Sequence, residues 1–149
     1  MTLLVGLQLD DRRYALPLSA VERITRVVEV MPLPDAPRAI AGVINVHGRI
    51  VAVVNIRERF ALPARTLRLT DQLLIAQTPK QTIALLVDAV LGVIECAEAD
   101  IVAASAIAPG MQTICGIAKL ADGMILIHDL DRLLSSDEQR AANDAMTGA

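Results

Sequence analysis

The first twenty residues alternate between apolar and other side chains, a period of two that is typical of a half-buried β-strand. One face of the first strand would carry Leu3, Val5, Leu7 and Leu9. Asp10-Asp11 then provides a turn, and the alternation resumes from Tyr14 to Leu18. The chain is therefore expected to begin with a β-hairpin that buries one face.

Three more strands are expected before residue 55. Ser19 is a favourable N-cap, so residues 19–23 predict one helical turn ahead of a β-branched strand at residues 24–30. Three prolines in the next eight residues then interrupt regular strand pairing. A fourth strand at residues 41–46, a turn at His47-Gly48 and an almost wholly apolar fifth strand at residues 49–54 follow.

The expected helical segments are short and follow the strands. Residues 56–62 predict a short helix, and residues 63–69 predict an exposed connector that carries two arginines. A capping pattern at Ser135 or Ser136 predicts a final helix at residues 137–145.

The second half of the chain repeats the first. Residues 83–90 match residues 14–21 at four of eight positions with an offset of 69, and residues 116–118 match residues 42–44 with an offset of 74. The change of offset places an insertion of five residues between the two matches, within residues 97–111. A chance match between aliphatic stretches is the alternative.

Two units of about 70 residues predict two small barrels that share a core, because neither alone buries enough surface to be stable. The chain is expected to be a single domain over residues 1–149. Within it, the expected subdomains are a first barrel at 1–66, a second at 67–135 and a C-terminal helix or tail at 136–149. The joint between the barrels is the expected groove.

Composition narrows the classes of partner. The apolar fraction is 54%, but only Tyr14 and Phe60 are aromatic, which favours aliphatic strand packing over aromatic ligand platforms. A formal charge of -3 leaves no basic field for nucleic acid. No apolar run is long enough to span a bilayer and no secretory signal precedes the first strand, so a cytoplasmic protein is expected.

The residues that could carry chemistry are scattered. His47 and His128 are the only neutral-pH bases, and neither stands in a recognisable catalytic motif, although His128-Asp129 could in principle form a dyad. Cys96 and Cys115 lack metal-ligand spacing and are expected to be buried thiols. No phosphate-binding glycine loop is present. We therefore expect no enzyme, no cofactor and no metal site.

One segment resembles a known signature. Residues 42–60 read Gly-Val-Ile-Asn-Val-His-Gly-Arg-Ile-Val-Ala-Val-Val-Asn-Ile-Arg-Glu-Arg-Phe, which resembles the Gly-Val-x-Asn-Leu-Arg-Gly, apolar strand and Asp-Leu-Arg of CheW-like coupling domains. Further segments that are similar to this family are Tyr14–Pro17, Val21–Ile24, Pro34–Pro37, Val87–Asp88 and Ile125–Leu134. The resemblance covers nearly the whole chain.

The resemblance implies an all-β fold of two SH3-like five-stranded barrels, with short helices after each barrel and at the C-terminus. It also implies a non-enzymatic adaptor that couples the cytoplasmic tip of a chemoreceptor (a methyl-accepting chemotaxis protein) to the regulatory domain of a CheA-type histidine kinase. Such an adaptor would be cytoplasmic and recruited to membrane receptor arrays, without inserting into the membrane.

The resemblance and the apolar runs also select residues for partner binding. A helical receptor hairpin is expected to bind in the groove between the barrels through Val21, Ile24, Val43 and Val87. The other residues expected to contact partners are Arg23, Asn45, His47 and Gly48.

The chain departs from the family pattern at three of its positions. Arg23 stands where the family often has Glu, and His47 stands where it usually has Arg, so the usual opposite-charge pair is absent. Asn55 replaces the Asp of Asp-Leu-Arg. Arg23 and His47 are expected to lie near each other at the partner-facing end of the first barrel, facing a carboxylate of the partner.

Two other functions stay open on the sequence alone. The chain could be a coupling protein of a non-chemotactic array that controls pili or a second-messenger cyclase, because charge complementarity sets partner choice. It could also be a small-molecule-binding β-barrel with a pocket at the joint.

Overall fold

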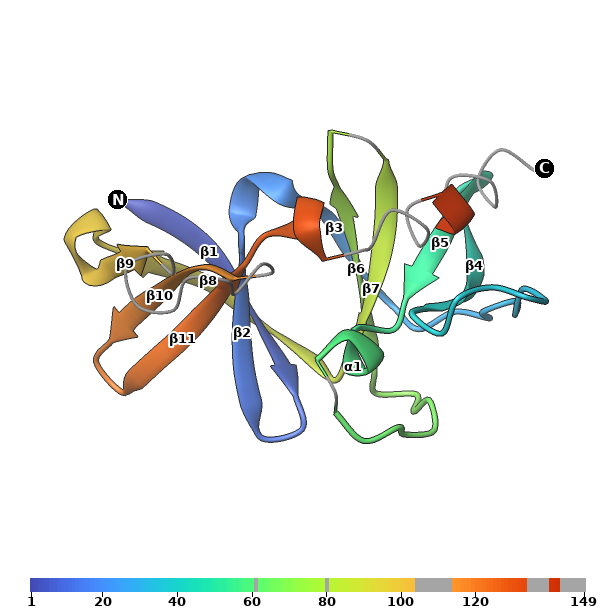
Figure 1. Cartoon of the computed structure of the whole chain (residues 1–149), viewed down its shortest axis with the longest axis horizontal. Coiled ribbons are helices and arrows are strands. Elements are labelled where there is room, and N and C mark those ends of the chain that lie inside the picture. Colours follow the sequence, from blue (N-terminus) through green and yellow to red (C-terminus); the bar gives the residue numbers. More distant parts are fainter. Residues whose placement is uncertain (61, 80, 104–113, 134–139, 143–149) are drawn as a thin grey trace.

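The computed structural model describes residues 1–60, 62–79, 81–103, 114–133 and 140–142. Within these ranges, six strands form one sheet and five strands form another, and the two sheets lie side by side along the longest axis of the molecule (Figure 1). The all-β fold of two SH3-like barrels that the sequence predicts is confirmed, with one barrel gaining a short sixth strand.

In hydrogen-bonding order, the six-stranded sheet consists of β8 (Ala89–Cys96), β1 (Thr2–Leu9), β2 (Arg12–Pro17), β11 (Gly123–His128), β10 (Ile114–Leu120) and β9 (Ile101–Ala103). The five-stranded sheet consists of β3 (Val21–Arg26), β6 (Gln72–Gln77), β7 (Thr82–Val87), β5 (Arg49–Val54) and β4 (Ile40–Val46). The short helical segments are η1 (Leu18–Ala20), α1 (Ile56–Arg59), η2 (Glu98–Asp100) and η4 (Leu130–Arg132).

Each sheet combines strands from both halves of the sequence. The hairpin β1–β2 belongs to the sheet of β8 to β11, whereas β3, β4 and β5 join β6 and β7. The chain crosses to the other sheet after β2 and again after β7, so β3 pairs with β6 and β8 pairs with β1. The expected division into a barrel at residues 1–66 and another at 67–135 is therefore wrong for the sheets: the five-stranded sheet is one continuous stretch from β3 to β7, and the six-stranded sheet combines β1 and β2 with β8 to β11.

The internal repeat is visible in the strand registers. In one sheet, β2 and β11 pair in parallel with Tyr14 opposite Leu126; in the other, β7 and β5 pair in parallel with Ile83 opposite Ala52. These pairs are related by the same offsets of 69 and 74 that the sequence shows. The register of β4 shifts at Gly42 and that of β10 shifts at the equivalent Gly116. The repeat is therefore structural, not a chance match.

The first strand, β1, is buried on both of its faces from Leu4 to Leu7. Leu4 faces a small cluster inside the six-stranded barrel, whereas Val5 and Leu7 face the main core, where the two barrels meet. A hairpin with one buried face was expected from alternation alone. The face of Leu4 and Gly6 is buried inside the six-stranded barrel, and packing of one barrel against the other covers the face of Val5 and Leu7.

The observed boundaries agree closely with the predicted ones at the fourth and fifth strands and less well at the third. The fifth strand matches residues 49–54, and the fourth begins one residue early, at Ile40. The third strand begins at Val21 instead of residue 24, because the expected helical turn is the earlier η1. Residues 140–142 are helical, and the rest of the expected final helix lies outside the described residues.

Candidate partner-binding surface

A tight turn between β4 and β5 positions His47. His47 and Gly48 both have positive φ values, 51° and 86°, and they connect Val46 to the residue that pairs with it, Arg49. This is the two-residue hairpin geometry that follows the right-handed twist of the strands. The Asn45 side-chain oxygen accepts a hydrogen bond from the Gly48 backbone N–H at 2.7 Å. Asn45 and Gly48 therefore shape the turn that presents His47 at the surface.

A hollow of about 280 Å³ lies where β3 and β4, the two ends of the five-stranded sheet, approach each other. Its lining residues are Arg23, Ile24, Thr25, Val28, Ile44, Asn45, Val46 and His47. The sequence-based expectation that Arg23 and His47 lie near each other is met, because both line this one hollow. Neither makes a hydrogen bond or ion pair with any other described residue.

An ion pair lies beside this hollow on positions that the sequence analysis did not select. The register between β3 and β6 shifts between Val21 and Arg23, so Glu22 is the extra residue of a β-bulge. Arg49 donates to both carboxylate oxygens of Glu22, at 2.9 and 3.0 Å. Opposite charges are absent from positions 23 and 47, as the sequence indicates, but a pair at positions 22 and 49 connects the same two segments.

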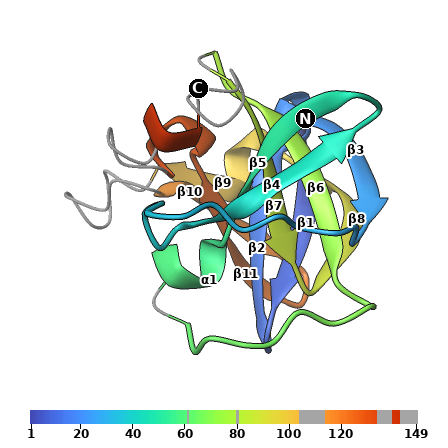
Figure 2. The same cartoon turned by 90° about the vertical axis from the view of Figure 1, so that its right-hand side faces the viewer.

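Several large aliphatic side chains on β1, β3 and β8 are exposed, and they are here called the exposed aliphatic side. Ile24 on β3 is 45% exposed and Val93 on β8 is 59% exposed, and Leu91 of β8 and Leu3 of β1 are also exposed. β3 and β8 lie on the same side in Figure 2. Val21 is half-buried at its margin and packs against the main core. Exposed apolar groups are typical of a protein-binding surface.

Two of the predicted contact residues are core residues instead. Val43 is 4% exposed and Val87 is 1% exposed, so neither side chain can contact a partner directly. Val43 is held by the backbone bridge between Met31 and Val43, and Val87 packs in the main core. The apolar runs that selected them reflect burial on the inner faces of β4 and β7.

A second hollow, of about 320 Å³, lies at the joint between the barrels. Its lining residues are Pro17, Ser19, Ala20, Gln77, Pro79, Cys115, His128, Asp129 and Leu130. None of the residues expected to form the receptor groove lines it. Cys115 is exposed instead of buried, and partial burial together with the nearby Asp129 raises the pKa of its thiol. A raised pKa disfavours the thiolate, so Cys115 is not an activated nucleophile.

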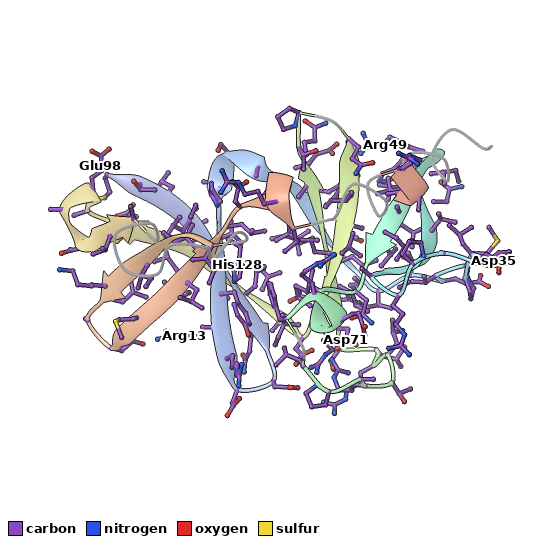
Figure 3. All side chains as sticks on the ribbon, viewed as in Figure 1. Arg13, Asp35, Arg49, Asp71, Glu98 and His128 are labelled. Carbon is purple, nitrogen blue, oxygen red and sulfur yellow. The ribbon has the colours of Figure 1, made fainter. Side chains whose placement is uncertain are left out.

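His128 lies at the middle of the molecule, between the two sheets (Figure 3). Its ring centroid is 4.4 Å from that of Phe60 and 5.2 Å from that of Tyr14, and Phe60 stacks on Tyr14 at 4.6 Å. The only two aromatic residues of the chain therefore meet this histidine at the joint. His128 is 3% exposed, so its ring packs with the core.

A charged network ties the two sheets together beside α1 and the chain crossing from β7 to β8. Arg57 is 7% exposed and donates to Asp10 at 2.6 Å and to Asp88 at 2.8 and 2.9 Å. Arg65 donates to Asp71 at 2.7 Å and also to Asp88. The connector at residues 63–69 is exposed, as expected, except at Arg65, whose guanidinium is held in this network because it bridges two carboxylates.

The network lowers the pKa of two of its carboxyl groups. The hydrogen bond from Arg57 lowers the pKa of Asp10. Partial burial opposes ionisation of Asp88, but hydrogen bonds from Arg57, from the backbone N–H of Asp10 and from Arg65 outweigh it, and the pKa of Asp88 is lowered. The pKa of Arg57 is raised, first by its hydrogen bond to Asp10. The lowered carboxyl pKa values and the raised pKa of Arg57 show that the folded chain favours the charged forms of these groups.

Within the described ranges, no group of three or more His, Cys, Asp or Glu side chains is arranged to hold a metal ion. In the same part of the chain, no helix has the length and apolar character needed to cross a membrane.

The model of the CheW-like domain matches residues 3–138. The chain belongs to the CheW-like family. It is 27% identical over 147 residues to the chemotaxis protein CheW of Treponema pallidum, covering 94% of this chain and 86% of that protein. It is also 27% identical over 141 residues to CheW of Rhizobium meliloti, covering 93% of this chain and 91% of that protein.

A solved structure shares the fold. The crystal structure of the scaffolding protein TtCheW from Thermoanaerobacter tengcongensis matches with a TM-score of 0.83 and 28% identity, covering 92% of this chain and 94% of that one. The likeness to the CheW-like family therefore covers the whole two-barrel fold and not only the segment that carries the signature. The hollow between β3 and β4 and the exposed aliphatic side lie within the matched region.

Proposed function

We propose that this chain is a non-enzymatic adaptor that couples the cytoplasmic tips of chemoreceptors to the regulatory domain of a CheA-type histidine kinase in chemotaxis signalling. The observation that carries the proposal is the CheW-like match over residues 3–138, together with relatives named as chemotaxis proteins and a structural neighbour titled a scaffolding protein. Such an adaptor would act in the cytoplasm and be recruited to receptor arrays at the membrane.

The distribution of side chains supports an adaptor over an enzyme. Catalysis needs an activated nucleophile beside an oriented base, but the pKa of the Cys115 thiol is raised and the ring of His128 is packed against Phe60 and Tyr14. An adaptor needs exposed apolar surface, which β1, β3 and β8 supply.

A small-molecule-binding barrel has less support. The two hollows measure about 280 and 320 Å³, at the lower end of the range of about 300–1,000 Å³ for ligand pockets. Their linings are open to the surface at exposed residues such as His47 and Cys115.

The exposed aliphatic side is the proposed site for the receptor tip. A receptor hairpin presents the apolar faces of two helices, which pack well on exposed aliphatic side chains. Ile24, Leu91 and Val93 would form the centre of the contact, with the half-buried Val21 at its margin. Val43 and Val87 would support this surface from inside the core. The hollow between β3 and β4 borders this surface at Ile24 and is the proposed place for the kinase.

The change Ile24→Asp is expected to weaken binding of a soluble receptor-tip fragment at least about tenfold, because a charge would be buried against apolar helix faces. Ile24 is already 45% exposed, so the free protein should stay folded by circular dichroism. Val21→Asp would be less informative, since Val21 also packs on the core. Binding is measured by isothermal titration calorimetry.

The matched control is Leu69→Asp, because Leu69 is 94% exposed and lies on the connector between α1 and β6, outside β1, β3 and β8. This variant should bind the receptor fragment like the wild type. Full affinity of a folded Ile24→Asp variant would show that the receptor does not bind this side.

A further inference from the structure

Two basic side chains line the hollow between β3 and β4 without any partner in the described part of the chain. Arg23 comes from β3 and His47 from the tip of the β4–β5 turn, and both are exposed. None of the hollow's lining residues is acidic. The nearest acidic position on β3, Glu22, is already neutralised by its two hydrogen bonds from Arg49.

We propose that Arg23 and His47 together bind the carboxylate of a glutamate or aspartate side chain on the kinase regulatory domain, and that this contact selects the partner. The inference rests on the proposed function, because it names the chemistry of the kinase contact. A guanidinium is the side chain best suited to a carboxylate, since its N–H groups match the two oxygens. An imidazole N–H adds a further donor.

The rest of the lining fits such an occupant. Val28 and Val46 offer aliphatic surface for the methylene groups of an acidic side chain and for an apolar neighbour. Asn45 keeps its side-chain NH₂ available, because its oxygen accepts the hydrogen bond from Gly48. A hollow of about 280 Å³ accommodates one side chain but not a helix or a strand. The occupant is therefore a single projecting acidic residue.

The position of the ion pair explains why the two bases stay available. A chain with opposite charges at positions 23 and 47 would satisfy both groups internally. Here the bulge at Glu22 moves the internal pair to positions 22 and 49, where it still joins β3 to β5. The Glu22–Arg49 ion pair is thus separate from Arg23 and His47. A partner's carboxylate can bind these two side chains without displacing a carboxylate of this chain.

The test measures binding of the purified kinase regulatory domain by titration calorimetry. Arg23→Glu is expected to weaken binding at least about tenfold, because it replaces an attraction with a like-charge repulsion. The matched control is Arg26→Glu, which makes the same charge change at an exposed position of β3 outside the hollow and should change affinity less than about twofold. Wild-type affinity should also fall as the NaCl concentration rises.

A second variant separates recognition from turn geometry. His47→Asn keeps a residue that tolerates positive φ, so the turn should stay intact while the imidazole is lost. We expect it to weaken kinase binding by about three- to tenfold without loss of stability. Among Asp or Glu to Lys changes made one at a time on the kinase domain, one should restore binding to the Arg23→Glu variant.

The outcomes distinguish this inference from the proposed function. If the wild-type chain binds no CheA-type regulatory domain, the proposed function fails. If it binds and Arg23→Glu binds as tightly as Arg26→Glu, the adaptor function stands and the carboxylate contact is wrong. If inorganic phosphate binds the free chain at this hollow and Arg23→Glu removes that binding while kinase affinity is unchanged, the hollow is a small-anion site and the inference is overturned.

Discussion

Replacing Arg57 with leucine is expected to lower the free energy of unfolding by about 3 kcal/mol. Arg57 is 7% exposed and donates hydrogen bonds to the carboxylates of Asp10, in the β1–β2 turn, and Asp88, between β7 and β8. Leucine would keep some of the packing but leave Asp10 and Asp88 facing each other with only Arg65 to compensate. The measurement is urea unfolding at neutral pH, followed by circular dichroism.

The control for this prediction is Arg12→Leu. Arg12 is an exposed arginine at the start of β2, next to the same turn, and its replacement should change stability by less than about 0.5 kcal/mol. Equal stability losses for the two variants would mean that the network does not hold the barrels together.

The same network should make the wild type sensitive to acid. The pKa values of Asp10 and Asp88 are lowered in the folded chain, so their contribution is complete above the ordinary carboxyl pKa of 3.8 and is lost as the pH falls below it. Unfolding curves of the wild type between about pH 3 and 7 should show this loss. The curve for Arg57→Leu should be flatter over the same range.

Gly42→Ala is the second change with a large expected effect, a loss of at least about 3 kcal/mol of stability. Gly42 has a φ of 154° and lies at the register shift of β4. An added Cβ would lie 2.2 Å from the carbonyl oxygen of Met31. The backbones of Met31 and Val43 are joined by two hydrogen bonds of 2.9 Å, each residue donating its N–H to the carbonyl oxygen of the other. The substitution would therefore break this bridge or distort β4.

Gly48→Ala provides the comparison, because Gly48 also has a positive φ, 86°, but an added Cβ would meet nothing within 4 Å. It should cost only the conformational penalty of about 1 kcal/mol. A smaller loss for Gly42→Ala than for Gly48→Ala, in thermal unfolding, would contradict the close approach of Met31 to β4.

Local patterns in the sequence predicted the strands and turns better than they predicted which strands pair with each other. The fifth strand and the His47-Gly48 turn follow from an apolar run and from a residue type that accepts positive φ. The placement of the β1–β2 hairpin with β8 to β11, and of the β6–β7 hairpin with β3 to β5, could not be inferred, because a repeat in sequence does not say which copy supplies each neighbouring strand. Only the paired registers, such as Tyr14 with Leu126, reveal it.

The candidate site was predicted in part. The proximity of Arg23 and His47 followed from the family resemblance, and the structure places both on one hollow. Val43 and Val87 were misassigned because an apolar residue in a signature can serve the core as well as a partner. The Glu22–Arg49 pair was missed because it depends on a bulge, and a bulge changes which face a side chain occupies without a mark in the sequence.

The most direct test of the adaptor function is kinase activity in a reconstituted array. Receptor fragments assembled on vesicles and the CheA-type kinase from the same cells are combined with and without this chain, and kinase autophosphorylation is measured. The chain is expected to join both proteins in one sedimenting complex and to raise autophosphorylation, and Ile24→Asp and Arg23→Glu should each reduce this increase. An unchanged rate, with neither protein recruited by the chain, would contradict the adaptor function.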